Sequence, residues 1–84
     1  MEIRVLGPGC ARCHEVEKRT LNALAQLDVA ADVRKVTDFK GIMTYGIPGT
    51  PGLVINGKVK CAARIPSVEE IKRWIGEEIG KPSD

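Results

Sequence analysis

The dipeptide Asn56-Gly57 is the sequence feature that most restricts the fold of this chain of 84 residues. It stands between the apolar run Leu53-Val54-Ile55 and residues 58–62, which are Lys-Val-Lys-Cys-Ala. Asn-Gly between two such runs is the strongest short-range signal of a β-hairpin, because both central residues of a type I′ turn need a positive φ. The sequence therefore predicts two adjacent antiparallel strands in the second half of the chain.

The first half of the chain predicts a parallel pair of strands joined by a helix. Residues 3–6 form a short expected strand, which Gly7-Pro8-Gly9 ends. A helix is expected from Cys10 to Leu27, because apolar positions recur on one stripe at about 100° per residue. The stripe consists of Cys13, Val16, Thr20, Ala23, Leu24 and Leu27. Residues 29–36 alternate as a second strand, and its short connection to the helix favours parallel pairing with the first.

The middle of the chain predicts a short helix. Its N-terminal cap is expected to be Thr37 or Asp38, and it runs to Tyr45, where Gly46 acts as the stop signal. A Gly- and Pro-rich loop at residues 47–52 then leads into the hairpin.

The pair Ser67 and Glu70 forms a capping box that opens a last helix. The expected inward side of this helix consists of Val68, Ile71, Trp74, Ile75 and Ile79. The predicted order of elements is β-α-β-α-β-β-α. We therefore expect an α/β fold, with a four-stranded mixed sheet flanked by three helices, as one domain over residues 1–80 and a short tail at 81–84.

The balance of charges argues against nucleic-acid binding as the main role. The chain has 13 Lys and Arg, 11 Asp and Glu, and one each of Phe, Tyr and Trp, without a basic block. No apolar run approaches the roughly 18 residues of a membrane span. The N-terminus does not have the charged segment and long apolar stretch of a secretory signal. We therefore expect a cytoplasmic protein that binds neither nucleic acid nor membranes.

The sequence Cys10-Ala11-Arg12-Cys13-His14 is compatible with three chemistries. C-x-x-C-H is the attachment pattern of a c-type haem, and C-x-x-C also occurs in soft-metal sites and in dithiol redox centres. In a reducing compartment, a close Cys pair is more often catalytic or metal-binding than structural. As a structural crosslink the bond would close a loop of about four residues and would stabilise the fold by only ~2 kcal/mol.

The expected geometry of the helix favours the redox interpretation. Cys10 would lie where free backbone N–H groups and the helix dipole stabilise a thiolate, and such sites lower thiol pKa values from about 8.5 to roughly 3.5–7.5. Cys13 lies on the apolar stripe and is expected to be buried and protonated. The spacing thus predicts Cys10 as an accessible nucleophile and Cys13 as a protected resolving thiol.

Binding or delivery of a soft metal, zinc or copper, by the same two thiols is the alternative interpretation. Metal chaperones of this kind end in a strand, whereas this chain ends in a capped helix. A structural zinc site needs four ligands, and only Cys61 and His14 are available to complete one. A haem site would require export and a hydrophobic pocket, and the sequence indicates neither.

Three segments resemble the small thioredoxin-like, or glutaredoxin-like, redox-active disulfide proteins of archaea and bacteria. They are GCARC at the first helix, TPGLVINGKVK around the hairpin and ARIPSVEEIK at the last helix. The resemblance covers nearly the whole chain and implies a thioredoxin-like fold. It also implies a thiol–disulfide oxidoreductase, a protein disulfide reductase in which Cys10 attacks and Cys13 resolves, and a cis bond before Pro51, with Thr50 and Pro51 binding the substrate.

The partners implied by this resemblance are protein disulfides and a thioredoxin-reductase-like or other dithiol electron donor. No cofactor is expected beyond the redox-active disulfide between Cys10 and Cys13, and the protein is expected to act as a monomer in electron transport and cell redox homeostasis.

The sequence departs from common thioredoxins around the two cysteines. Gly9 replaces a Trp, Ala11-Arg12 replaces Gly-Pro, and Arg4 replaces a buried Asp that usually accepts the proton of the resolving thiol. Arg12 and His14 are candidates for tuning the pKa of the Cys10 thiol.

The third cysteine, Cys61, alternates in phase with Val59 on the expected last strand. We therefore expect it to be a buried, inert thiol outside the catalytic cycle.

Overall fold

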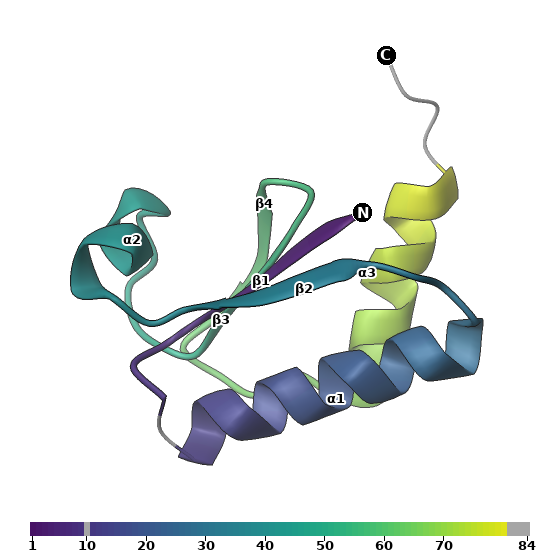
Figure 1. The fold of residues 1–84 in the computed structure, drawn as a ribbon, viewed down its shortest axis with the longest axis horizontal. Helices are drawn as coiled ribbons and strands as arrows, with labels where there is room; N and C mark the ends of the chain where they lie inside the picture. The colour runs from purple at the N-terminus through teal and green to yellow at the C-terminus, as the bar shows by residue number, and fades with distance from the viewer. Residues whose placement is uncertain (10, 81–84) are drawn as a thin grey trace.

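The computed structural model describes residues 1–9 and 11–80. In chain order the elements are β1 (Glu2–Leu6), α1 (Ala11–Leu27), β2 (Asp32–Val36), α2 (Phe39–Thr44), β3 (Gly52–Ile55), β4 (Lys58–Ala62) and α3 (Val68–Gly80), as Figure 1 shows. This is the order expected from the sequence. The expected tail at residues 81–84 lies outside the described residues.

The four strands form one mixed sheet in the order β2-β1-β3-β4. β1 runs parallel to β2 and antiparallel to β3, and β3 and β4 form the antiparallel hairpin. In the hairpin turn, Asn56 and Gly57 have φ values of 51° and 80°, the positive angles that a type I′ turn needs. The predicted α/β fold with a four-stranded mixed sheet is therefore confirmed.

The sheet separates two hydrophobic clusters. Successive residues of a strand point to opposite faces, so Ile3 and Val5 of β1 lie on one face and Leu6 on the other. The larger cluster joins Ile3 and Val5 to residues of α1 and α3, such as Val16 and Ile71. The smaller cluster joins Leu6 to Ile42 of α2 and to Val54 of β3. Helices α1 and α3 thus cover one face and α2 covers the other (Figure 1).

The expected stripe of α1 is buried. Its buried residues are Cys13, Val16, Thr20, Ala23 and Leu24, and Leu27 packs partly buried against the same cluster. Thr20 is the polar member, and its hydroxyl donates to the carbonyl oxygen of Val16 at 2.8 Å. This bond satisfies the hydroxyl inside the helix, so Thr20 is buried without an unpaired polar group.

The caps of α2 and α3 have a clear chemical basis. The Asp38 carboxylate accepts from the Gly41 N–H at 2.8 Å, so Asp38 rather than Thr37 is the cap of α2. In α3 the Glu70 N–H donates to the Ser67 hydroxyl, and the Ser67 N–H donates to the Glu70 carboxylate, both at 3.1 Å. These two bonds are the capping box expected from the sequence.

The second strand is shorter than expected, because it begins at Asp32 rather than at Val29. Val29 donates its N–H to the carbonyl oxygen of Leu24, and Asp28 before it has a φ of 55°. These residues therefore end α1 instead of extending the sheet. Pairing begins at Asp32 because its partner in the register, Glu2, is the first residue of β1.

The expectation that Ile79 faces inward is wrong, because its side chain is 54% exposed. Ile79 follows the helical period from Ile75, but the last turn of α3 lies beside the hairpin turn. There the preceding residue, Glu78, contacts Asn56 and Lys58. The helix therefore extends past the end of the core.

The expectation that the side chains of Val59 and Cys61 lie on the same face of the sheet is also wrong. The register shifts between Leu53 and Val54, so that Leu53 opposes Cys61 while Val54 opposes Val59. This bulge places the two side chains on opposite faces. Cys61 is 6% exposed, as expected, whereas Val59 on the edge strand is 42% exposed.

Candidate functional site

The first turn of α1 carries Cys13, whose side chain is only 2% exposed. Cys13 begins the apolar stripe of α1, and the helix is held to the sheet by the stripe residues that follow it. The burial expected for the resolving cysteine is therefore present. The expected nucleophile, Cys10, lies outside the described residues.

The sulfur of Cys13 lies against the backbone of Gly7, directly after β1. A Cβ placed on Gly7 would overlap this sulfur and would lie 3.9 Å from the Cβ of Thr50. Gly7 itself is buried and donates its N–H to the carbonyl oxygen of Val36 at 3.0 Å, which continues the β1–β2 pairing. Gly7 and Cys13, six positions apart, and the distant Thr50 thus lie close together at the end of β1.

Thr50 and Pro51 form the loop that enters β3. The Thr50–Pro51 peptide bond is cis. Pro51 is buried, whereas Thr50 is half-buried and borders the cleft described below. The structure therefore brings Thr50, one of the two expected substrate-binding residues, close to the expected resolving sulfur.

Arg12 and His14 flank Cys13 along α1, and both are exposed. Their expected role in tuning Cys10 stays a prediction. Arg4 occupies the place where common thioredoxins have a buried Asp, but its guanidinium group points to the other end of β1. There it lies 2.6 Å from the Glu2 carboxylate and 3.7 Å from the Asp32 carboxylate. Arg4 also faces away from α1, because it alternates with Ile3 and Val5.

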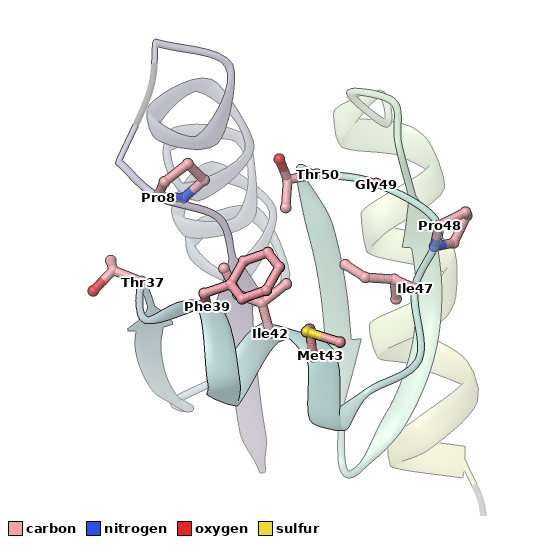
Figure 2. A pocket seen from close by; sticks show the side chains of 9 residues that line it. All are labelled: Pro8, Thr37, Phe39, Ile42, Met43, Ile47, Pro48, Gly49 and Thr50. Atoms are coloured by element: carbon pink, nitrogen blue, oxygen red, sulfur yellow. The ribbon is translucent and has the colours of Figure 1, made fainter.

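An apolar cleft of about 490 Å³ opens beside the site (Figure 2). Its lining residues are Pro8, Thr37, Phe39, Ile42, Met43, Ile47, Pro48, Gly49 and Thr50. Figure 2 shows Phe39 and Met43 of α2 on one side and the loop from Ile47 to Thr50 on the other. Pro8 follows Gly7, and Thr50 lies near the same point as the Cys13 sulfur, so the cleft opens beside the segments that surround Cys13.

The cleft was missed by the reasoning from the sequence. The available signal was Phe39 and Met43, two large apolar residues four positions apart on a short helix, which places them on the same side. In the structure both are exposed, and Phe39 has 76% of its surface accessible. Large apolar side chains left in solvent around a cleft are typical of a binding surface.

Cys61 lies near the end of β4, next to the turn that contains Arg64. Its Sγ is 3.6 Å from the carbonyl oxygen of Arg64. Burial raises the pKa of the Cys61 thiol; the charge of Arg64 opposes this shift and the charge of Glu70 adds to it. A buried thiol with a raised pKa is a poor nucleophile at neutral pH.

Within residues 1–9 and 11–80, no three His, Cys, Asp or Glu side chains are grouped so as to hold a metal ion. The soft-metal alternative depends on Cys10, which those ranges do not include, so it stays a prediction. Nor does any helix in the described part of the chain have the length and apolar character needed to cross a membrane.

Comparisons with known proteins agree with this fold. A family model described as a thioredoxin domain matches residues 1–76. A thioredoxin of Methanothermobacter thermautotrophicus is 36% identical over 73 residues, which cover 87% of this chain and 95% of the relative. A thioredoxin of Methanocaldococcus jannaschii is 36% identical over 70 residues, covering 83% and 80% of the two chains. The chain therefore belongs to the thioredoxin family.

Proposed function

We propose that this protein is a thiol–disulfide oxidoreductase that reduces disulfides of other proteins through Cys10 and Cys13. Family membership supports the general redox role. The observation that carries the proposal is the position of Cys13: it is buried against Gly7 at the end of β1, near Thr50, which lines the apolar cleft.

The proposed reaction has two exchanges. In the first, the Cys10 thiolate attacks one sulfur of the substrate disulfide, forms a mixed disulfide and releases the other substrate sulfur as a thiolate. In the second, the Cys13 thiolate attacks the Cys10 sulfur, so that the Cys10–Cys13 bond forms and the second substrate sulfur leaves. The two released thiolates take up two protons, two electrons have passed to the substrate, and the protein is left oxidised.

The burial of Cys13 supports its role in the second exchange. Cys13 is 2% exposed and is therefore shielded from a folded protein partner, so a substrate disulfide meets its sulfur only after being held on Cys10. Shielding also protects a resolving thiol from side reactions that require access. The proposal thus assigns separate tasks to the two cysteines of one short motif.

The surroundings of Cys13 support a protein as the substrate. We assign Thr50 and Pro51 to substrate binding, because Thr50 borders both the sulfur and the cleft. An extended segment of a partner can pair with backbone groups at such a loop and place an apolar side chain in the cleft. A small disulfide would leave the exposed surface of Phe39 and Met43 unused.

To work repeatedly, the oxidised protein must be reduced again by a dithiol donor, which we propose to be a reductase of the thioredoxin-reductase type or another dithiol protein. This role suits the cytoplasm, where a close Cys pair is more often catalytic than structural.

The experiment that tests the function compares Cys10→Ser and Cys13→Ser, both with Cys61→Ala so that a third thiol does not interfere. With insulin as the disulfide substrate, Cys10→Ser should lose reductase activity, and Cys13→Ser should accumulate a covalent complex that dithiothreitol releases. Retained activity in Cys10→Ser, or no complex in Cys13→Ser, would contradict the proposal. An inactive parent protein that keeps zinc or copper(I) against a chelator would instead support the soft-metal alternative.

A further inference from the structure

We propose that Gly7 is a positioning residue for Cys13, because the missing side chain of Gly7 creates the space in which the resolving sulfur lies. This inference rests on the proposed function for its catalytic meaning, but its geometric part stands on the structure alone. The juxtaposition that carries it is the overlap between a Cβ on Gly7 and the sulfur of Cys13.

The backbone conformation does not explain this glycine. Gly9, two residues later, has a φ of 93°, which other residues rarely adopt, and a Cβ placed there meets no atom within 4 Å. Gly7 is the opposite case: its φ is not among the positive values of the chain, but a Cβ there would meet both the sulfur and the Cβ of Cys13, the latter at 3.1 Å. Position 9 therefore needs a glycine because of its backbone conformation, whereas position 7 needs one because there is no room for a side chain.

Neither side of this contact can move away easily. The N–H of Gly7 is held by the carbonyl oxygen of Val36 at 3.0 Å, directly after the paired residues Leu6 and Val36. On the other side, Cys13 is followed on its stripe by the buried Val16, which anchors α1 to the core. Because protein interiors are closely packed, a methyl group on Gly7 would displace the sulfur rather than be absorbed by empty space.

The position of this sulfur matters for one chemical step. In the resolving exchange, the Cys13 thiolate must approach the Cys10 sulfur of the mixed disulfide along the S–S axis, so that the Cys10–Cys13 bond forms as the substrate thiolate leaves. A displacement of about 1 Å in such a reacting group costs on the order of 100-fold in rate. The first exchange, attack by Cys10, does not involve the Cys13 sulfur. Gly7 is thus expected to control resolution selectively.

The geometric part is tested by a double-mutant cycle on the reduced protein. We would measure urea unfolding midpoints for Gly7→Ala, Cys13→Ala and the double variant in dithiothreitol. Gly7→Ala should lower the unfolding midpoint. This decrease should be smaller by at least about half in the Cys13→Ala background, where the sulfur is absent, because contacting residues are energetically coupled. If Gly7→Ala alone does not fold, folding of the double variant supports the contact, and its failure to fold contradicts it.

Gly52→Ala is the matched control for this cycle. A Cβ on Gly52 would also be crowded, lying 2.9 Å from Cδ1 of Ile47 and 3.3 Å from Cδ1 of Leu6, but it does not meet Cys13. Its effect on the midpoint should be the same with and without Cys13→Ala. Equal losses from Gly7→Ala in both backgrounds would overturn the proposed contact.

The catalytic part is tested with 5,5′-dithiobis(2-nitrobenzoate) on the reduced protein carrying Cys61→Ala. Attack by Cys10 releases one thionitrobenzoate, and resolution by Cys13 releases a second, so the two steps separate in time. Gly7→Ala should slow the second release roughly 10- to 100-fold and leave the first within about twofold. An unchanged second release, or equal slowing of both, would contradict the inference. The parent protein could show the expected coupling between Gly7→Ala and Cys13→Ala and still fail to reduce insulin. That result would contradict the proposed function but would still support the contact between Gly7 and Cys13.

Discussion

The backbone N–H of Ala63 donates a hydrogen bond to the carbonyl oxygen of Pro51 at 2.9 Å. This bond extends the β3–β4 pairing past Gly52 and Ala62, and it holds the turn after β4 against the loop of the proposed site. Ala63 makes it with a φ of 63°, in the left-handed region, which costs a residue with a Cβ roughly 1–2 kcal/mol. The loop beside Cys13 is thus fastened by a residue in an unfavourable conformation.

Replacing Ala63 by Gly should therefore not destabilise the protein. Removing the Cβ relieves roughly 1–2 kcal/mol in the folded state, while the greater freedom of Gly in the unfolded state takes back about 0.4–1 kcal/mol. We expect a net stabilisation between about zero and 1.5 kcal/mol, measured by urea unfolding at pH 7. Ala62→Gly, one residue earlier in β4, is the control and should destabilise by about 0.5–1 kcal/mol. Equal losses in the two variants would contradict this explanation.

The apolar cleft makes a prediction about substrate size. Phe39→Ser removes an exposed aromatic side chain from the rim. The minority of residues that dominate a binding surface are often aromatic, and truncating one of them costs about 1 kcal/mol or more. We expect kcat/KM for insulin to fall roughly fivefold, which corresponds to that energy. The rate with 5,5′-dithiobis(2-nitrobenzoate) should stay within about twofold, because this small disulfide does not need the cleft.

Leu21→Ser is the matched control for Phe39→Ser, because Leu21 is an exposed apolar residue on α1 that does not line the cleft. It should leave both rates unchanged. A loss with insulin that is equally large in both variants would show that general surface hydrophobicity, rather than the cleft, determines the rate.

Glu78 makes a prediction about the pH dependence of stability. The hydrogen bond from Lys60 lowers the pKa of Glu78 to about 2, against the effect of burial, with help from Asn56 and the charge of Lys58. A carboxyl group with a lowered pKa in the folded state stabilises the fold above its unfolded pKa, near 4.5, and this contribution is lost as the pH falls towards about 2. Glu78 therefore supports the hairpin fully at neutral pH.

Glu78→Gln should lower the urea midpoint at pH 7, and its difference from the parent protein should shrink between pH 4.5 and about 2. The control is Glu69→Gln on the same helix, where an exposed pair with Lys72 at 3.6 Å should contribute little at either pH. A Glu78→Gln difference that stays constant down to pH 2 would show that packing, and not charge, is responsible.

Cys61 should not take part in the catalytic cycle. Burial raises the pKa of its thiol, so the reactive thiolate is scarce at neutral pH. In the reduced protein, limiting iodoacetamide at pH 7 should leave Cys61 unlabelled when peptides are mapped by mass spectrometry. Cys61→Ala should keep insulin reduction within about twofold. Loss of activity in a folded Cys61→Ala protein would require a mechanism with three thiols.

Several local features of this protein follow from short stretches of sequence. The Asn56-Gly57 turn, the capping box of Ser67 and Glu70 and the buried stripe of α1 all appear as expected. Each depends on residues within a few positions of one another, whose geometry is set by a turn or by the helical period. The order of these elements was enough to predict the mixed sheet, and the helical period was enough to predict the burial of Cys13. The roles of Thr50 and Pro51 came from the family resemblance and stay predictions.

Tertiary structure decided the features that join distant segments. The bulge opposite Leu53 separated Val59 from Cys61, and the end of the core left Ile79 in solvent. The need for a residue without a side chain at position 7 became visible only in the folded structure, where Cys13 and Thr50 lie close to Gly7. The cleft likewise needs three segments, from Pro8, from α2 and from the loop before β3. Such contacts depend on strand register and on the packing of helices over the sheet, and no period or motif within one segment specifies them.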